Sequence, residues 1–373
     1  MSTVDDILNN SVTQVPEQDA EEAKLWEDVL KMRISVNDEI EKEEFMLHNG
    51  EVAFFAKGDV SAIKSKPKQG KTNSIAAMVA AMLKGSWGPL TCKIEGCNIV
   101  WIDTEQRHSD AKRIYLRALK MAGLSMEDNF SRFQMFHLRS FMNDKKMDSL
   151  KLIIKNCQPD IIFIDGIVDL INNFNDVEES KNIIDTLMRL STKEESGKNI
   201  AIVCVLHTNK AAEDRNMRGH LGTMLTQKAG TVLEVKKNGQ IFTVSNTESR
   251  NKEVPEWSFR FDDNGDIVDA TFMVEQATKE QKEKREAEKK AKSEAEKQKL
   301  IQTMKDIIRK HGGKIERTIF RNELIEITGK AVPTVNGYIS KYINANIIKE
   351  VNGNIFIVEE SAANNNQQDM IFN

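Results

Sequence analysis

The sequence lacks an apolar run long enough to cross a membrane. Its longest apolar stretch, residues 75–83, is far shorter than the roughly 20 residues that a bilayer-spanning helix needs. The first residues are acidic and do not form an export signal. We therefore expect a cytoplasmic protein with no membrane partner.

Cysteine is scarce, and a strong excess of either charge is absent. The four cysteines, Cys92, Cys97, Cys157 and Cys204, form no close Cys-x-x-Cys or Cys/His pair of the zinc-binding kind, so we interpret them as buried or incidental thiols. The formal net charge of -4 over 373 residues does not indicate nucleic-acid binding across the whole surface. Any basic surface must be confined to one domain.

Composition divides the chain into five segments. We expect a disordered acidic arm over residues 1–24, an α/β domain over 25–272, a charged helical linker over 273–299, a small domain over 300–358 and a disordered tail over 359–373. A helical lead-in is predicted at 23–32. The linker has no apolar seam for a coiled coil, which favours a solvated single helix or tether.

Within the α/β domain, β-branched runs alternate with amphipathic stretches. This alternation indicates βαβ units around a mainly parallel sheet. The predicted strands are 60–63, 98–103, 132–138, 160–165 and 200–207, and the predicted helices are 74–83, 110–122, 147–156 and 177–190. Two hairpins with Asn-Gly turns follow these elements, and they predict an antiparallel extension of the sheet. The first pairs 231–236 with 240–245, and the second pairs 257–261 with 267–270.

A phosphate-binding loop follows the first of these strands. The candidate nucleotide-binding residues are Ser65, Lys66, Pro67, Lys68, Gln69, Gly70, Lys71, Thr72 and Asn73. A turn entering a helix aims backbone N–H groups at phosphate oxygens, Lys71 reaches the outer phosphates, and Thr72 offers a hydroxyl to Mg²⁺. Ser65 replaces the first glycine of the pattern, which predicts a loop entrance that is tilted or less mobile than usual. The alternative is a lysine-rich surface turn.

Later strands end in polar residues that suit nucleotide chemistry. Asp165 ends an apolar strand and would hold Mg²⁺ together with Thr72. Glu105 follows the second strand and is our candidate general base for the attacking water, unless it only caps the next helix. His207 ends another strand, where it could sense the γ-phosphate, although a buried structural histidine is the alternative.

The small C-terminal domain has the outline of a winged helix. Its predicted elements are helices at 300–310, 317–328 and 334–345 and a two-stranded ribbon at 347–358. Thr334, Asn336, Ser340 and Lys341 lie on the candidate recognition helix and could contact duplex DNA. A winged helix that binds protein is the alternative.

Taken together, the motifs resemble the RecA-type ATPase core, especially hexameric replicative helicases of the plasmid RepA type. The resemblance covers residues 45–270 and rests on Lys71/Thr72, Glu105, Asp165, His207-x-Asn209-Lys210 and the run from Arg218 to Gly222. It implies a RecA-like P-loop NTPase fold, ATP with Mg²⁺, assembly of identical copies into a hexameric ring, and single-stranded DNA in a central channel.

The resemblance also assigns roles in that ring. Residues 211–222 match a mobile DNA-facing loop, with Lys210, Arg215 and Arg218 available for DNA phosphates. Arg250 matches the arginine that a neighbouring subunit supplies to the γ-phosphate, although Glu248 replaces a lysine that the family often carries, and a surface ion pair is the alternative. The chain is therefore expected to be a DNA helicase, or alternatively an ATP-switched DNA-binding loader with slow turnover.

Overall fold

The computed structural model describes residues 20–39, 42–208 and 217–358. These residues fall into two compact units, which divide between Thr271 and Phe272. The first five residues of the helix α2 (Ala20–Lys31) lie within the segment expected to be a disordered arm. Its alanine, glutamate, lysine and leucine residues favour helix, which explains the earlier start.

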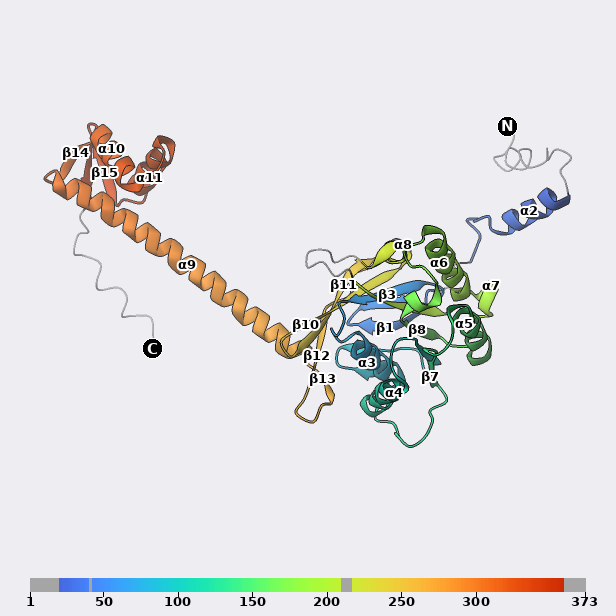
Figure 1. Ribbon diagram of the computed structural model, residues 1–373. Helices are drawn as coiled ribbons and strands as arrows, with labels where there is room; N and C mark the ends of the chain where they lie inside the picture. Colours follow the sequence, from blue (N-terminus) through green and yellow to red (C-terminus); the bar gives the residue numbers. More distant parts are fainter. Residues whose placement is uncertain (1–19, 40–41, 209–216, 359–373) are drawn as a thin grey trace, which may run out of the picture. The chain divides into compact units, whose positions relative to one another are not determined.

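A nine-stranded sheet organises the first unit (Figure 1). The five predicted central strands are present as β3 (Val60–Ser65), β6 (Ile99–Asp103), β7 (Phe133–His137), β8 (Ile161–Asp165) and β9 (Ala201–His207). The other four are β10 (Thr231–Asn238), β11 (Ile241–Ser249), β12 (Trp257–Phe261) and β13 (Ile267–Asp269). The strand order is β13-β12-β11-β10-β3-β9-β8-β6-β7. Strands β10, β3, β9, β8, β6 and β7 pair in parallel and the rest antiparallel, which confirms an α/β fold with an antiparallel extension.

Helices cover both faces of this sheet because its central strands are buried on both sides. The helices α3 (Lys71–Lys84) and α4 (His108–Ala122) pack on one face, and α5 (Asn143–Cys157), α6 (Val177–Ser191) and α8 (Gly219–Lys228) pack on the other. The remaining short helices are η1 (Ile167–Leu170) and α7 (Lys193–Ser196). The carboxyl ends of β3, β6, β8 and β9 therefore meet at one edge of the sheet.

A second, small sheet was not predicted from the sequence. It is four-stranded, in the order β2-β1-β5-β4, and consists of β1 (Phe45–Asn49), β2 (Val52–Ala56), β4 (Ser86–Trp87) and β5 (Leu90–Thr91). Met46, Leu47, Phe54 and Leu90 bury their side chains in the same core as α3 and α4. Two of these strands have only two residues, which is too short for a detectable apolar alternation.

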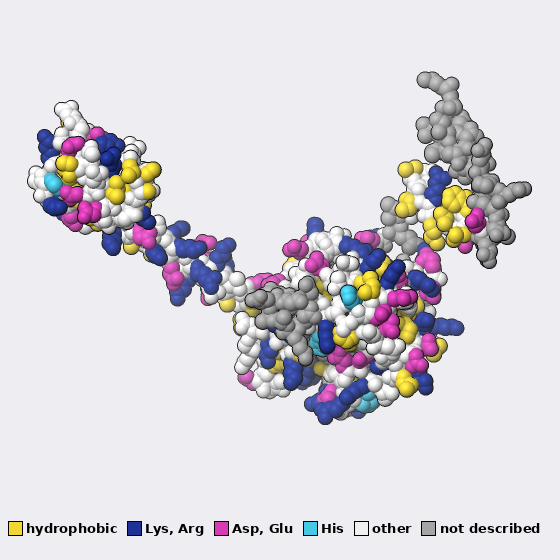
Figure 2. Space-filling view, turned by 45° about the horizontal axis from the view of Figure 1, so that its top comes forward, with side chains coloured by type: hydrophobic (Ala, Val, Ile, Leu, Met, Phe, Trp, Pro, Cys, Tyr) yellow, Lys and Arg dark blue, Asp and Glu magenta, His cyan; other side chains and the backbone are white. Residues whose placement is uncertain are grey.

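The second unit begins with α9 (Thr271–Lys310), one continuous helix where the sequence predicted a linker and a separate helix. Every residue from 275 to 299 is exposed, and basic Lys and Arg side chains are interspersed with acidic Glu side chains along this part of the helix (Figure 2). Neither glycine nor proline stands at the boundary between the predicted linker, which ends at residue 299, and the predicted helix, which begins at residue 300. The helix therefore continues through it. It ends in the small core formed with α10 (Arg317–Thr328) and α11 (Val332–Asn344).

Three strands complete this unit: β14 (Lys314–Glu316), β15 (Ile348–Val351) and β16 (Asn354–Ile357), in the order β14-β16-β15. The predicted ribbon is thus extended by β14, whose three residues gave no strand signal. Ile301, Phe320, Ile339 and Ile355 are among the residues of its core. Among the described residues, none of the helices combines the length and apolar content needed to span a bilayer.

Candidate nucleotide-binding site

The loop between β3 and α3 is shaped without the first glycine of the phosphate-loop pattern. Left-handed backbone angles occur at Lys68, with φ of 62°, and at Gly70, with φ of 90°. Ser65 instead continues β3 and pairs in register with His207, and its hydroxyl donates to the Lys66 carbonyl over 2.7 Å. The loop entrance therefore follows the sheet at Ser65.

Gly70 lets the start of α3 lie against an aromatic ring. A β-carbon at this position would lie 2.5 Å from Cδ1 of Phe242 on β11, so no larger residue fits without a shift. No described side chain caps this end of α3, and its first backbone N–H groups are free to bind an anion. Gln69 fastens the loop to β10, because its side-chain oxygen accepts from the Lys237 backbone N–H over 2.6 Å.

Lys71 is the first residue of α3, and its side chain is buried at the sheet edge. Its Nζ lies 2.8 Å from Nδ1 of His207. Burial lowers the pKa of Lys71 to about 8, although the carboxylates of Asp165 and Glu105 act in the opposite direction. A phosphate group beside Nζ would favour the charged form of the lysine.

Thr72 and Asp165 meet across the same edge. The Thr72 hydroxyl donates to Oδ2 of Asp165 over 3.1 Å. Burial raises the pKa of Asp165 to about 7, and the neighbouring carboxylates of Asp103 and Glu105 add to this effect. A buried carboxyl among other acids, next to a hydroxyl, has the oxygen donors and the uncompensated negative charge that suit Mg²⁺. The two residues therefore fit the predicted metal role.

Glu105 is held in place by two neighbouring strand ends. Its backbone N–H donates to Oδ1 of Asp103 over 3.1 Å, and Gly166, after β8, comes so near that a β-carbon there would lie 2.8 Å from Cγ of Glu105. Its Oε2 lies 3.6 Å from Nε2 of His207. The nearby His207 lowers the pKa of Glu105, so the carboxylate is ionised at neutral pH and able to accept a proton.

A cavity of about 460 Å³ joins these groups. Of the predicted loop residues, Lys66 and Pro67 are exposed and do not line this cavity. Five residues that do line it were not predicted from the sequence: Gln106, Ile114, Arg117, Phe242 and Phe261. The Arg117 guanidinium donates to Oδ1 of Asn73 over 2.7 Å and lies 5.3 Å from the ring centre of Phe261. Phe242 and Phe261 reach the site only because the sheet order places β11 and β12 near β3, which no local pattern reveals.

Arg250 lies at the other end of β3 from the loop. It follows β11, its backbone N–H donates to the Gly230 carbonyl, and its guanidinium contacts the Lys228 carbonyl and lies 3.8 Å from Asp59, directly before β3. The six residues of β3 span about 16 Å at 3.3 Å per residue. Arg250 therefore does not join the nucleotide site of its own chain.

The predicted DNA contacts are spread over both units. Asn209, Lys210 and Arg215 lie outside the described residues. Arg218 is exposed, with its guanidinium 4.7 Å from the ring centre of Phe174. Because α8 begins at Gly219, the last part of the predicted loop is helical. On α11, Thr334, Ser340 and Lys341 are exposed and Asn336 is half-buried.

The first unit is similar to a known domain family and to solved structures. Residues 37–213, slightly less than half of the chain, match the AAA domain family AAA_25. No curated protein matches. Among solved structures, the RadB recombinase is similar with 17% identity and a TM-score of 0.41, covering 58% of this chain and 93% of that one. A KaiC-like protein from Pyrococcus horikoshii OT3 is similar with 16% identity and a TM-score of 0.39, covering 58% and 91%. With the loop, sheet and site described above, the family match supports a RecA-like P-loop ATPase domain.

Proposed function

We propose that this protein is an ATP-hydrolysing, DNA-binding motor, a replicative helicase of a plasmid or mobile element. The observation that carries the proposal is the convergence of Lys71, Thr72, Glu105, Asp165 and His207 at the carboxyl edge of one parallel sheet. A phosphate-binding loop alone indicates nucleotide binding. An ionised glutamate beside it adds the group that hydrolysis requires.

Each residue then has a defined task. The first N–H groups of α3 and the Lys71 ammonium bind the phosphates, and Mg²⁺, held by Thr72 and Asp165, would offset their negative charge. Glu105 accepts a proton from the water that attacks the γ-phosphate. His207 lies between Lys71 and Glu105 at 2.8 and 3.6 Å, so it is placed to respond to the loss of the γ-phosphate.

The second unit supports DNA binding. Its order of helix end, β14, α10, α11, β15 and β16 is the outline of a winged helix, with α11 as the recognition helix. Residues 300–358 contain nine Lys and Arg against five Asp and Glu, a net charge of +4 in a chain whose total is -4. This local basic excess favours duplex DNA over a purely protein partner.

A ring of identical copies gives Arg250 a role that it cannot have in its own chain. Because it lies about 16 Å along β3 from the loop, it can reach a γ-phosphate only in a neighbouring copy. One observation favours the alternative of an ATP-switched DNA-binding loader with slow turnover. The Arg250 guanidinium already contacts Asp59 and the Lys228 carbonyl, and these contacts must break before it can act on a neighbour.

The test is steady-state ATP hydrolysis with and without single-stranded DNA, with particle mass measured on the same samples. Lys71→Ala should abolish nucleotide-dependent activity, and Glu105→Gln should bind ATP without hydrolysing it. Arg250→Ala and Lys71→Ala should each be inactive, and a mixture of the two should regain activity, because some sites then combine an intact lysine with an intact arginine. Slow turnover that changes neither with DNA nor with the Arg250→Ala substitution would favour the loader. Unchanged turnover in Glu105→Gln would exclude Glu105 as the general base.

A further inference from the structure

Two of the four cysteines stand at the two ends of one loop. Cys92 directly follows β5 of the small sheet, and Cys97 comes two residues before β6 of the large sheet. Cys97 is buried, whereas Cys92 is half-buried and can be reached by small molecules in the solvent. Residues 93, 95 and 96 between them are exposed, which leaves the loop room to adjust.

Both ends of this loop are held at the last turn of α3. The Cys92 backbone N–H donates to the Gly85 carbonyl over 2.8 Å, and the Cys97 thiol donates to the Met82 carbonyl over 3.7 Å. The Cys92 thiol donates to the Ile94 carbonyl, within its own loop, over 3.5 Å. Because Met82 and Gly85 are about one helical turn apart, these contacts bring the two cysteines together at the same place.

The surroundings make Cys92 the most reactive of the cysteines. The Cys97 thiol lies close enough to hydrogen-bond to the Cys92 sulfur, which lowers the pKa of Cys92 although burial acts in the opposite direction. The same contact, together with burial, raises the pKa of Cys97. Burial also raises the pKa of Cys157 and of Cys204. Since the thiolate is the reactive form of a cysteine, Cys92 should react first, and Cys97 is placed to react second.

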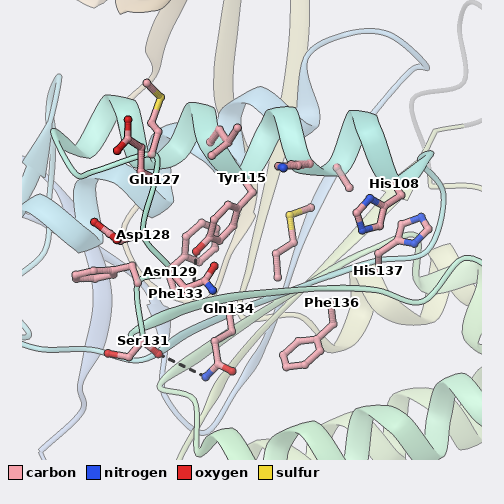
Figure 3. A pocket seen from close by; sticks show the side chains of 16 residues that line it. His108, Tyr115, Glu127, Asp128, Asn129, Ser131, Phe133, Gln134, Phe136 and His137 are labelled. Carbon is pink, nitrogen blue, oxygen red and sulfur yellow. Dashed lines mark hydrogen bonds between the residues drawn. The ribbon is translucent and has the colours of Figure 1, made fainter.

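A positive charge adjoins the same loop. Residues 129–131 and Phe133 line a hollow of about 710 Å³ between α4 and β7 (Figure 3), and Arg132 is not among the residues that line it. The guanidinium of Arg132 instead reaches the cysteine loop, where its Nη1 would lie 3.7 Å from a β-carbon at Gly96. Its charge favours a thiolate at Cys97, against the effect of burial.

We propose that Cys92 and Cys97 form an oxidation site that reacts with peroxides and closes to a disulfide. The Cys92 thiolate attacks one oxygen of hydrogen peroxide, the O–O bond breaks, and the departing oxygen leaves as water with the proton that the Cys92 thiol released. The Cys97 sulfur then attacks the sulfenic acid formed on Cys92. The S–S bond forms, the S–O bond breaks, and the proton of the Cys97 thiol leaves with that oxygen as a second water. Two electrons pass from the two thiols to the peroxide.

The disulfide would tie the small sheet to the large one. Strand β5 pairs with β1 through two residue pairs and with β4 through two more, so few hydrogen bonds hold it in place. A bond from Cys92 to Cys97 would link this strand directly to the start of β6 and limit its local opening. Lys71 and Met82 lie about 16 Å apart along α3 at 1.5 Å per residue, so ATP binding should not change. The proposal therefore does not rest on the proposed function.

Peptide mapping of the full-length protein tests the site. The protein is treated with hydrogen peroxide, the remaining thiols are alkylated with iodoacetamide, and the peptides are analysed by mass spectrometry. We expect a disulfide between Cys92 and Cys97 within one chain, alkylated Cys157 and Cys204, and full reversal by dithiothreitol. A disulfide between chains, oxidation spread over all four cysteines, or an unoxidised Cys92 would each overturn the proposal.

Substitutions separate the roles of the two thiols. In Cys97→Ser, whose hydroxyl can still donate to the Met82 carbonyl, peroxide should leave a sulfenic acid on Cys92 that dimedone traps. In Cys92→Ser the Cys97 thiol should stay reduced, and the matched control Cys157→Ser should form the disulfide as the wild type does. Dimedone labelling of Cys97 in Cys92→Ser, equal to that of Cys92 in Cys97→Ser, would overturn Cys92 as the attacking thiol.

Hydrogen exchange measures what the disulfide does to the fold. The amides of residues 86–92 should exchange about tenfold more slowly in the oxidised wild type than in the reduced protein. The Cys97→Ser variant should show no such change on treatment with peroxide. Equal exchange of these amides in the oxidised and reduced wild type would overturn the proposed tie between the two sheets.

Discussion

Gly166 is the position at which a single methyl group should do most harm to the candidate site. It follows β8 with φ of 106°, and a β-carbon there would lie 2.1 Å from the Thr104 hydroxyl and 2.8 Å from Cγ of Glu105. An L-residue in left-handed backbone costs about 1–2 kcal/mol, and overpacking in a core costs about 1–3 kcal/mol. We therefore expect Gly166→Ala to lower the free energy of unfolding by about 2–5 kcal/mol.

For a domain of this size, that loss corresponds to a fall in Tm of about 5–20 °C, which a thermal melt without nucleotide measures. The same methyl group should displace Glu105 while Lys71 and Thr72, on α3, stay in place. ATP affinity measured by titration calorimetry should then remain near that of the wild type, while kcat falls.

A double-mutant cycle identifies the cause. Thr104→Ala removes the hydroxyl that donates to the Asp165 and Gly166 carbonyls, at a cost of about 1–2 kcal/mol. It also removes the nearest atom to the new methyl group, so the double variant should be more stable than the sum of the single effects predicts, by about 1–3 kcal/mol. Effects that add to within about 0.5 kcal/mol would refute the proposed clash.

Three further predictions concern other parts of the chain. Because burial raises the pKa of Asp165 to about 7, a proton competes with Mg²⁺ near and below that pH. Mg²⁺-dependent ATP binding should therefore weaken about fivefold from pH 7 to 6, and equal affinity at pH 6 and 8 in calorimetry would contradict this. Gly70→Ala should weaken ATP binding because its methyl group meets Phe242. The double variant Gly70→Ala with Phe242→Leu should recover part of the lost affinity, and an unchanged ATP affinity in Gly70→Ala alone would show that the loop adapts without cost. Phe320→Ala empties a fully buried position in the second unit and should destabilise that unit by about 3–5 kcal/mol without changing ATP affinity. Hydrogen exchange measures the loss, and equal protection of α10 in the wild type and the variant would rule it out.

The sequence predicted the central sheet well because its strands are short apolar runs that end in chemically distinctive residues. Asp103, Asp165 and His207 each end a strand at the position expected, and the parallel pairing of those strands explains why the residues meet. The two-residue strands β4 and β5 gave no such signal, because two residues cannot show a period.

Other parts of the site depend on contacts between segments that are distant in the sequence. Phe242 and Phe261 line the cavity through the order of strands. The space at Gly166 is closed by Thr104 and Glu105, which lie about 60 residues earlier in the sequence. The shape of the loop could not be predicted for a related reason: its left-handed angles lie at Lys68 and Gly70, and a glycine pattern does not specify which residue takes them.

The order of strands also bears on how the chain is made. Strand β3 carries the phosphate-binding loop and is the first of the nine to be synthesised, yet its two neighbours in the sheet are β9 and β10. At about 5–20 residues per second, a ribosome needs on the order of ten seconds to add those partners. During that interval a strand destined to be buried on both faces has both edges unpaired, which is when such a chain is most exposed to aggregation. The centre of the finished sheet thus forms only after β9 and β10 have been made, and protection of the nascent chain matters most before residue 207 has emerged.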